Sequence, residues 1–229
     1  MGTGQEPPVT DADEHSAVET ARTYDRIAGH FAATREYAWP EVETFLSGRR
    51  GRVALDVGCG NGRHTETLAA HANTVVGVDI SRALLREARQ RATSRGFEAT
   101  FLHGDAATLP VGDDEVDLAV YVATLHHLSP RDRRVRSLDE LARVLAPDGA
   151  AVVSAWATVH DRFADEHGDA DVGFDTTVDW TLPGGETVPR FYHIYAPAEF
   201  RADLDASRLR PERVFVSSGN CYAVVSAPR

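Results

Sequence analysis

The feature that most constrains the fold is a short apolar segment that runs directly into a glycine-rich turn. Residues 53–62 read Val-Ala-Leu-Asp-Val-Gly-Cys-Gly-Asn-Gly, with Asp56 two residues before the first glycine. Glycine tolerates positive φ and lets the backbone come close to a ligand. A buried strand that ends in such a turn predicts a ligand site at its carboxyl end, lined by Gly58, Gly60 and Gly62.

Two further acids follow the next two apolar segments. Asp79 ends the run 74–79, and Asp105 follows Phe101-Leu-His-Gly. The carboxyl ends of parallel strands share one edge of a sheet, so we expect Asp56, Asp79 and Asp105 to converge there. The first carboxylate can accept hydrogen bonds from an ammonium group, and the second can take both ribose hydroxyls of a nucleoside.

The order Asp-x-Gly-x-Gly-x-Gly, acid, then Gly-Asp-Ala resembles the class I S-adenosylmethionine methyltransferases. The resemblance implies S-adenosylmethionine as cofactor, with Asp56 at its methionyl amino group, Asp79 at the ribose, and Asp105 and Ala106 at the adenine edge. The implied cofactor-binding residues are Tyr24, Asp56, Gly58, Gly60, Asn61, Gly62, Asp79, Ile80, Asp105, Ala106 and Val122.

A dinucleotide-binding dehydrogenase is the competing interpretation of the glycine turn. Its fingerprint is G-x-G-x-x-G followed by a ribose-binding acid. In this chain the glycines alternate, and Arg63 stands where that fingerprint needs a glycine or alanine. A carboxylate two residues before the turn also disfavours binding of a pyrophosphate. The pattern therefore favours the methyltransferase.

The charge pattern is unusual. The 229 residues contain no lysine, so all 24 cationic residues are arginines, against 35 acids and a formal net charge of −11. Two explanations stay open: adaptation to a cytoplasm of high salt, where the Debye length falls to about 3 Å at 1 M, and a GC-rich genome. Such a balance argues against nucleic-acid binding through basic patches. Molar salt would suppress that kind of affinity in any protein.

The remaining composition is that of a soluble cytoplasmic protein. Hydrophobic residues make up 42% of the chain, and no apolar run approaches the ~20 residues that span a bilayer. The N-terminus lacks a basic segment followed by an apolar one, so no signal peptide is expected. Cys59 and Cys221 are isolated thiols without metal-ligand spacing, and we expect no metal.

Alternating apolar runs and amphipathic segments predict an α/β fold with a parallel sheet. We expect a disordered tail (1–14), an N-terminal helical cap (15–52), a cofactor-binding core (53–157), an acidic substrate lid (158–194), and a C-terminal helix and hairpin (195–229). The predicted helices are 16–33, 41–47, 63–72, 81–95, 131–146 and 197–207, and the predicted strands are 53–57, 74–79, 98–103, 116–121, 150–156, 212–218 and 221–227. The class I resemblance implies a seven-stranded Rossmann-like sheet, mostly parallel, with an antiparallel C-terminal hairpin and helices on both faces.

The flanks resemble the tRNA wobble-uridine carboxymethyl methyltransferases, which esterify a carboxylate in the anticodon loop. The segments that carry this resemblance are Tyr24–Arg35 with Trp39-Pro40, Leu125-His-His-Leu-Ser129, Arg190-Phe-Tyr-His-Ile-Tyr195 and Gly219-Asn-Cys-Tyr222. The implied mechanism is in-line attack of a carboxylate oxygen on the sulfonium methyl. The expected catalytic residues are Arg35, His126, Arg190, His193 and Asn220, and the expected substrate-binding residues are His30, Trp39 and Tyr192.

These residues have structural alternatives that the sequence leaves open. His126 can face the methyl group or shape the floor beneath the cofactor, and Trp39 can stack on a base or belong to the core. Arg190 can hold the carboxylate bidentately or pair with a neighbouring acid. Asn220 can contact substrate or satisfy its turn.

Partners and rival functions follow from the same flanks. The resemblance implies a small zinc-binding activator subunit that pairs along the third-strand edge, residues 97–102, since exposed edges invite strand addition. The nearest rival function is methylation of a small molecule such as a quinone or a metabolite carboxylate. A cofactor-binding subunit without catalysis is a second rival.

Overall fold

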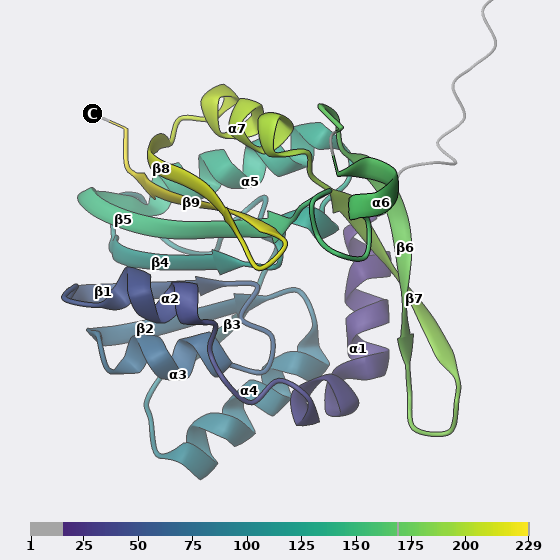
Figure 1. Ribbon diagram of the computed structural model, residues 1–229. Coiled ribbons are helices and arrows are strands. Elements are labelled where there is room, and N and C mark those ends of the chain that lie inside the picture. The colour runs from purple at the N-terminus through teal and green to yellow at the C-terminus, as the bar shows by residue number, and fades with distance from the viewer. Residues whose placement is uncertain (1–15, 169, 229) are drawn as a thin grey trace, which may run out of the picture.

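The computed structural model describes residues 16–168 and 170–228, so the tail predicted over 1–14 lies outside the described residues (Figure 1). A seven-stranded sheet forms the centre, in the order β3-β2-β1-β4-β5-β9-β8. Its strands are β1 (Gly51–Val57), β2 (Ala72–Asp79), β3 (Thr100–His103), β4 (Val116–Val122), β5 (Leu145–Trp156), β8 (Arg210–Ser217) and β9 (Asn220–Ser226).

Strand direction in the sheet reverses only at β9. β3, β2, β1, β4 and β5 pair in parallel, and β9 pairs antiparallel with both β5 and β8. The prediction of a mostly parallel seven-stranded sheet with an antiparallel C-terminal hairpin is therefore confirmed. The chain order reverses between β1 and β4, and a sheet of this type binds its ligand at the carboxyl ends of the strands beside that reversal.

Helices cover both faces of the sheet. They are α1 (Ala17–Ala33), α2 (Pro40–Leu46), α3 (Arg63–Ala69), α4 (Arg82–Arg95), α5 (Arg131–Val144), α6 (Ala164–His167) and α7 (Pro197–Ala206), with a 3₁₀ turn η1 (Leu125–His127). One apolar cluster joins α5 and α7 to the sheet, and a second joins α2 and α3 to its other face. Ser16 and Glu19 form a capping box, so the chain itself starts α1 where the sequence predicts.

β5 begins five residues before the predicted strand. Val116 pairs with Leu145, while Leu118 pairs with Ala150, so residues 146–149 bulge out of the ladder. Pro147 cannot donate a ladder hydrogen bond, and a Cβ on Gly149 would come within 2.5 Å of the Val116 carbonyl oxygen. The predicted turn at Pro147–Gly149 is thus an interruption within one strand.

The segment expected to be a lid of little apolar periodicity contains a two-stranded antiparallel ribbon, which the sequence analysis did not predict. The ribbon consists of β6 (Phe174–Thr181) and β7 (Thr187–Ile194), and β7 contacts α1 and η1. Val178 and Trp180 of β6 are buried and alternate with the exposed Thr177 and Asp179. This period of two was the available signal, but the many acids and the glycines of the turn concealed it.

No helix among residues 16–168 and 170–228 is both long and apolar enough to cross a membrane.

Candidate active site

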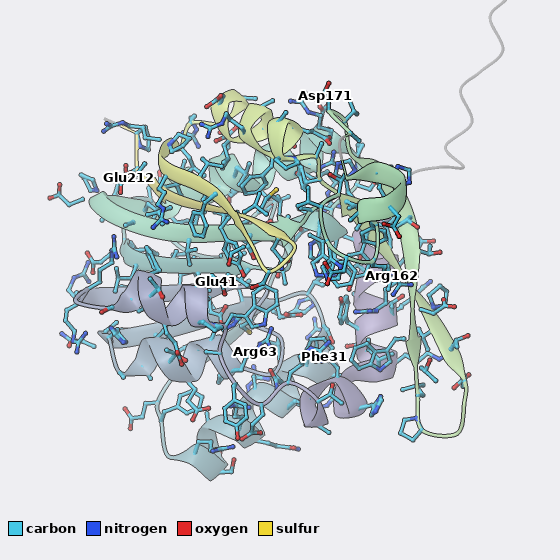
Figure 2. All side chains as sticks on the ribbon, viewed as in Figure 1. Phe31, Glu41, Arg63, Arg162, Asp171 and Glu212 are labelled. Carbon is cyan, nitrogen blue, oxygen red and sulfur yellow. The ribbon has the colours of Figure 1, made fainter. Side chains whose placement is uncertain are left out.

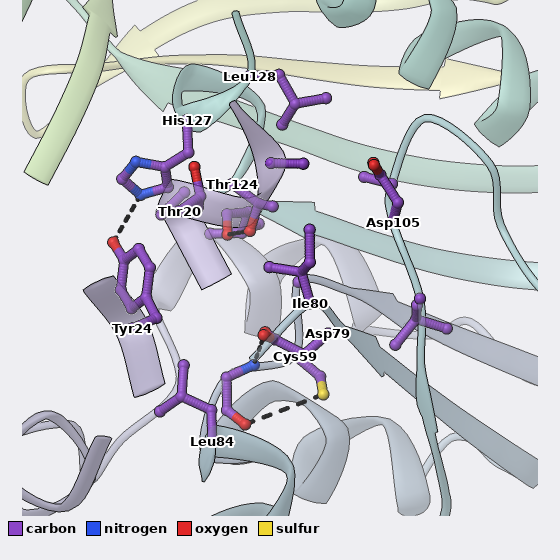
Figure 3. Close-up of a pocket in the computed structure, with 18 of the residues that line it drawn as sticks. Thr20, Tyr24, Cys59, Asp79, Ile80, Leu84, Asp105, Thr124, His127 and Leu128 are labelled. Carbon is purple, nitrogen blue, oxygen red and sulfur yellow. Dashed lines mark hydrogen bonds between the residues drawn. The ribbon is translucent and has the colours of Figure 1, made fainter. Parts of the chain in front are cut away.

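A cavity lies where the first strands of the sheet end (Figure 3). The cavity and the open space at its mouth together make up about 910 Å³. Its wall is formed by α1, the glycine turn after β1, and the residues that follow β2, β3 and β4. The predicted cofactor residues on this wall are Tyr24, Gly58, Gly60, Asn61, Asp79, Ile80, Asp105, Ala106 and Val122.

The glycine turn needs its glycines for two reasons. Gly58 and Gly60 have φ values of 70° and 55°, in the left-handed region that side chains disfavour. A Cβ on Gly58 would also lie 2.1 Å from the Oγ1 of Thr124, which follows β4. The turn can therefore pack tightly under the cavity only with glycine at this position.

Asp79 is the acid best placed to bind a ribose. One carboxylate oxygen accepts the Gly60 N–H at 2.8 Å (Figure 3). The other accepts the Ser81 N–H at 2.8 Å. Burial raises the pKa of Asp79 to about 6, although both backbone hydrogen bonds act to lower it. Each oxygen keeps a second lone pair, so the ionised carboxylate can accept a pair of vicinal hydroxyls.

Asp56 does not reach the cavity wall, which corrects the expectation that three acids converge on the ligand. It is 1% exposed and accepts a hydrogen bond from the Thr65 hydroxyl at 2.6 Å. Burial raises its pKa to about 7. Gly62 is also absent from the wall and packs against Ala88 of α4. Asp56 and Gly62 therefore support the glycine turn from behind.

The far end of the cavity fits a flat, largely apolar ring. Asp105 accepts the Ala107 N–H at 2.9 Å and pairs with Arg133 at 2.5 Å, which fixes the loop after β3. The apolar side chains on the cavity wall include those of Ile80, Leu84, Ala106, Val122 and Leu128. Together with Asp79, they fit the adenine and ribose of S-adenosylmethionine, whereas the predicted contact from Asp56 has no support.

His127, rather than His126, lines the cavity, which corrects the predicted orientation of this pair. The Tyr24 hydroxyl is hydrogen-bonded to His127 Nε2 at 2.7 Å (Figure 3). His127 Nδ1 donates to the Phe191 carbonyl at 2.8 Å. His126 is 1% exposed, and its Nδ1 accepts the Trp156 N–H at 3.0 Å. Burial and the adjacent imidazole lower the pKa of His126 well below its ordinary value, so it is neutral.

Two arginines without an acidic partner lie beside Tyr24. Arg190 is only 7% exposed and its Nε has no hydrogen-bond partner. Its guanidinium lies 4.8 Å from the ring of Trp180, and that of Arg35 lies 5.2 Å from the same ring. Neither arginine forms an ion pair with a carboxylate of residues 16–168 or 170–228. Burial, then the charge of Arg190, lowers the pKa of Arg35. The two guanidinium groups therefore lie against one ring with no acidic partner among residues 16–168 and 170–228.

His193 is not available to a substrate. Its Nδ1 lies 2.6 Å from Asp175 and its Nε2 lies 2.9 Å from Glu199, so the ring bridges β6 to α7. Asn220 donates to the Ser218 carbonyl at 2.8 Å, while its Oδ1 is buried without a partner. Neither residue lines the cavity.

The three predicted substrate-binding residues make internal contacts. Tyr192 is 4% exposed and stacks on Trp156, so it belongs to the core and is not an open stacking platform. Trp39 packs 5.3 Å beneath the Arg63 guanidinium. His30 accepts the indole N–H of Trp180 at 3.0 Å and so acts on the arginine pair only through that ring. The sequence analysis missed Trp180, His127 and Arg63.

Comparisons with known proteins agree with this geometry. A family model described as "Methyltransferase domain" matches residues 54–149. A putative methyltransferase of Encephalitozoon cuniculi is 34% identical over 179 residues, which cover 76% of this chain and 79% of that protein. The chain belongs to the class I S-adenosylmethionine-dependent methyltransferases. The prediction of an S-adenosylmethionine-dependent methyltransferase is thereby confirmed.

Two further similarities are to a longer protein and to one chain of a solved complex. A tRNA (carboxymethyluridine(34)-5-O)-methyltransferase of Arabidopsis thaliana is 39% identical over 138 residues, 59% of this chain but 32% of that protein. The methyltransferase thus spans about a third of that relative's length. A solved complex of the Haloferax volcanii Trm112 methyltransferase activator with a putative methyltransferase matches with a TM-score of 0.66 and 18% identity, covering 92% of this chain and 98% of that chain. This last likeness concerns the fold.

Proposed function

We propose that this methyltransferase esterifies the carboxylate of a 5-carboxymethyl-type uridine at the wobble position of tRNA. The observation that carries the proposal is the pair Arg35 and Arg190. A buried guanidinium that lacks an acidic partner is costly unless an anion completes its contacts. The name of the Arabidopsis relative and the flanking segments of the sequence point to the same carboxylate.

The reaction depends little on general acid or general base catalysis. Bound S-adenosylmethionine supplies an electrophilic methyl group, and a carboxylate oxygen takes that methyl as the carbon–sulfur bond breaks. The carboxylate is already ionised at neutral pH, so no residue has to remove a proton. His127 is oriented by its hydrogen bonds with the Tyr24 hydroxyl and the Phe191 carbonyl. The chain's contribution is orientation, which can supply about 7–11 kcal/mol in well-aligned systems.

We place the cofactor in the cavity and the substrate carboxylate at its margin, because Arg35 and Arg190 do not line the cavity but interact with Tyr24, which does. Asp79, Asp105 and Tyr24 hold the cofactor side, and Arg35 and Arg190 hold the substrate carboxylate beside it. Arginine presents a planar fork that matches a carboxylate. Trp180 supports both guanidinium groups on one ring. We assign no contact with substrate to His193, which two carboxylates already hold.

An activator subunit is part of the proposal. β3 is an edge strand of the sheet and pairs only with β2 among the described strands. Glu98 and Thr100 are exposed along this edge, residues 97–102, so a partner strand can add there. The Haloferax complex supports such a partner for a protein of this fold. Co-expression with a small zinc-binding activator should raise solubility and cofactor affinity, and no change in either would contradict it.

The proposed setting is a cytoplasm of high salt. Acidic side chains exceed arginines by 35 to 24, which keeps a protein soluble where salt screens charge. Stability that rises between 0.1 and 2 M KCl in denaturant unfolding would support this setting. Stability that falls over the same range would contradict it.

The decisive experiment compares anticodon nucleosides by mass spectrometry from wild-type and deletion strains. The deletion should leave the carboxymethyl uridine unesterified. A matched assay in vitro uses two anticodon stem-loops that differ only in whether the wobble uridine carries the carboxymethyl group. Equal labelling of both RNAs, or unchanged nucleosides in the deletion strain, would refute the proposal.

A further inference from the structure

Tyr37 is an exposed aromatic residue that the proposed reaction does not use. Its side chain is 81% exposed, the largest value among the exposed large hydrophobic residues that the structure describes. It lies in the connection between α1 and α2, where residues 34–39 form no helix or strand. An aromatic ring left this open in a connection needs an explanation, because it contributes little to the core.

The backbone around Tyr37 is held although it has no regular structure. Three successive carbonyls accept hydrogen bonds from three side chains: Asn61 donates to that of Arg35 at 2.8 Å, Arg91 to that of Glu36 at 2.5 Å, and Arg63 to that of Tyr37 at 3.4 Å. Arg91 is itself fixed by Glu66 at 2.6 Å. The connection is therefore ordered in advance, and it presents the Tyr37 ring outward.

Three arginines lie around Tyr37, and two of them, Arg91 and Arg95, are paired with Glu66 and Glu36, so Arg63 leaves one positive charge over in a protein of net charge −11. Arg63 lines the cavity and forms no ion pair with a carboxylate among residues 16–168 and 170–228. Its guanidinium rests 5.3 Å from the Trp39 ring. Burial, then the charge of Arg35, lowers the pKa of Arg63 to about 10. An anion near Arg63 would offset both the burial of its charge and the repulsion from Arg35. Figure 2 places Arg63 and Phe31, both on the cavity wall, on the same flank of the molecule.

We propose that Tyr37 stacks on a base of single-stranded RNA next to the methylated nucleotide, while Arg63 contacts the phosphate between the two. This proposal rests on the proposed function and describes how an acidic protein would bind its RNA. Stacking on aromatic side chains is the usual way to hold a splayed base, and it does not depend on counterion release. A protein partner fits less well, because the ring stands alone beside a cation that lacks an acid.

The test uses a seven-nucleotide RNA of anticodon-loop sequence with 5-carboxymethyluridine at its centre. Binding is measured by fluorescence anisotropy and methylation by transfer of labelled methyl groups, both with the full chain. Tyr37→Ala should raise the Kd and the KM for this RNA about 5- to 150-fold. Its kcat, its affinity for S-adenosylhomocysteine and the slope of log Kd against log salt should stay unchanged, because no phosphate contact is removed.

Two variants serve as controls. Tyr37→Phe keeps the ring and should bind the RNA within about twofold of wild type, as stacking requires. Val172→Ala changes another exposed residue, 72% exposed, next to Asp171, which Figure 2 shows far from Arg63. It should have no effect. Thermal unfolding of Tyr37→Ala should match wild type, because the ring is exposed.

The outcomes separate the two proposals. Equal RNA affinity of Tyr37→Ala and wild type would overturn the stacking proposal, whether or not the RNA is methylated. Binding that depends on Tyr37 without methylation would support stacking and refute the proposed function alone. A wild-type protein that neither binds nor methylates the RNA would overturn both.

Discussion

Replacing Arg190 by methionine should make the free protein more stable while it removes activity. Arg190 is 7% exposed, its Nε lacks a partner, and Arg35 lies near enough for the two charges to interact. Each of these features costs free energy in the folded state. A substrate carboxylate would compensate for them, so the cost is present mainly when the site is empty. Function and stability therefore oppose each other at this residue.

The size of the effect follows from three contributions. Removing a buried charge that lacks an acid stabilises a fold by about 1–4 kcal/mol when an apolar residue of similar volume replaces it. The lost contacts with the rings of Trp180, at 4.8 Å, and Tyr192, at 5.1 Å, cost about 1–2 kcal/mol. Contacts between the methionine sulfur and those rings return about 0.3–1.5 kcal/mol. The three contributions combine to a change between about −1 and about +4 kcal/mol, centred on a net gain of about 2 kcal/mol, or about 4–8 °C in Tm.

Arg134 provides the matched control. It is 4% exposed, as buried as Arg190, but it lies 3.5 Å from Glu199 and 3.7 Å from Asp203. Arg134→Met should lower the free energy of unfolding by about 1–3 kcal/mol, because Glu199 and Asp203 each lose one cationic partner while His193 and Arg131 stay beside them. The same substitution at two equally buried arginines should thus change stability in opposite directions.

Denaturant unfolding measures both variants without ligand. Calorimetry with S-adenosylhomocysteine should show unchanged affinity for Arg190→Met, and its kcat/KM on the carboxymethyl RNA should fall at least about 100-fold, as expected for two lost charge-assisted hydrogen bonds. An Arg190→Met protein that is less stable than wild type by more than about 1 kcal/mol would refute the reasoning, since the guanidinium would then be a structural group.

Three further predictions concern the cofactor side of the site. Affinity for S-adenosylhomocysteine should fall about tenfold per pH unit below about pH 6, because burial raises the pKa of Asp79 to about 6 and the carboxylate must be ionised to accept two hydroxyls. Calorimetry from pH 5 to 8 tests this. The Asp79→Asn variant should bind S-adenosylhomocysteine weakly, and its affinity should not depend on pH in this range. Thr65→Val should lower the free energy of unfolding by about 1–3 kcal/mol, and by more at pH 9 than at pH 5. Burial raises the pKa of Asp56 from 3.8 to about 7, so Asp56 is ionised at pH 9, and the Thr65 hydroxyl stabilises that ionised form. Since the pKa of Asp56 in the folded state lies above its unfolded value, the Asp56 carboxyl favours folding below about pH 4, and that contribution is lost as the pH rises through about 7. If Thr65→Val lowers the free energy of unfolding equally at pH 5 and pH 9, the Thr65 hydroxyl does not act on ionised Asp56. Tyr24→Phe removes the donor to His127 Nε2 and should weaken binding of S-adenosylhomocysteine about 5- to 10-fold by calorimetry, and unchanged affinity would show that this hydrogen bond does not shape the cavity.

Local sequence determined the cofactor half of this protein. The glycine turn after β1, the acid that ends β2 and the capping box at Ser16 are short-range features, because each depends on residues within a few positions of one another. Strand polarity then places Asp79 and Asp105 at one edge of the sheet. These features were therefore accessible from the amino-acid order alone.

Side-chain direction and pairing across the fold were decided only by the tertiary structure. Two adjacent histidines look alike in the sequence, but the 3₁₀ turn points His127 to the cavity and buries His126. His193 contacts acids 18 residues before and 6 residues after it, whereas Arg190 on the same strand pairs with no acid in the part of the chain that the structure describes. Such contacts depend on how β6, β7 and α7 pack, which periodicity and spacing along the chain do not encode.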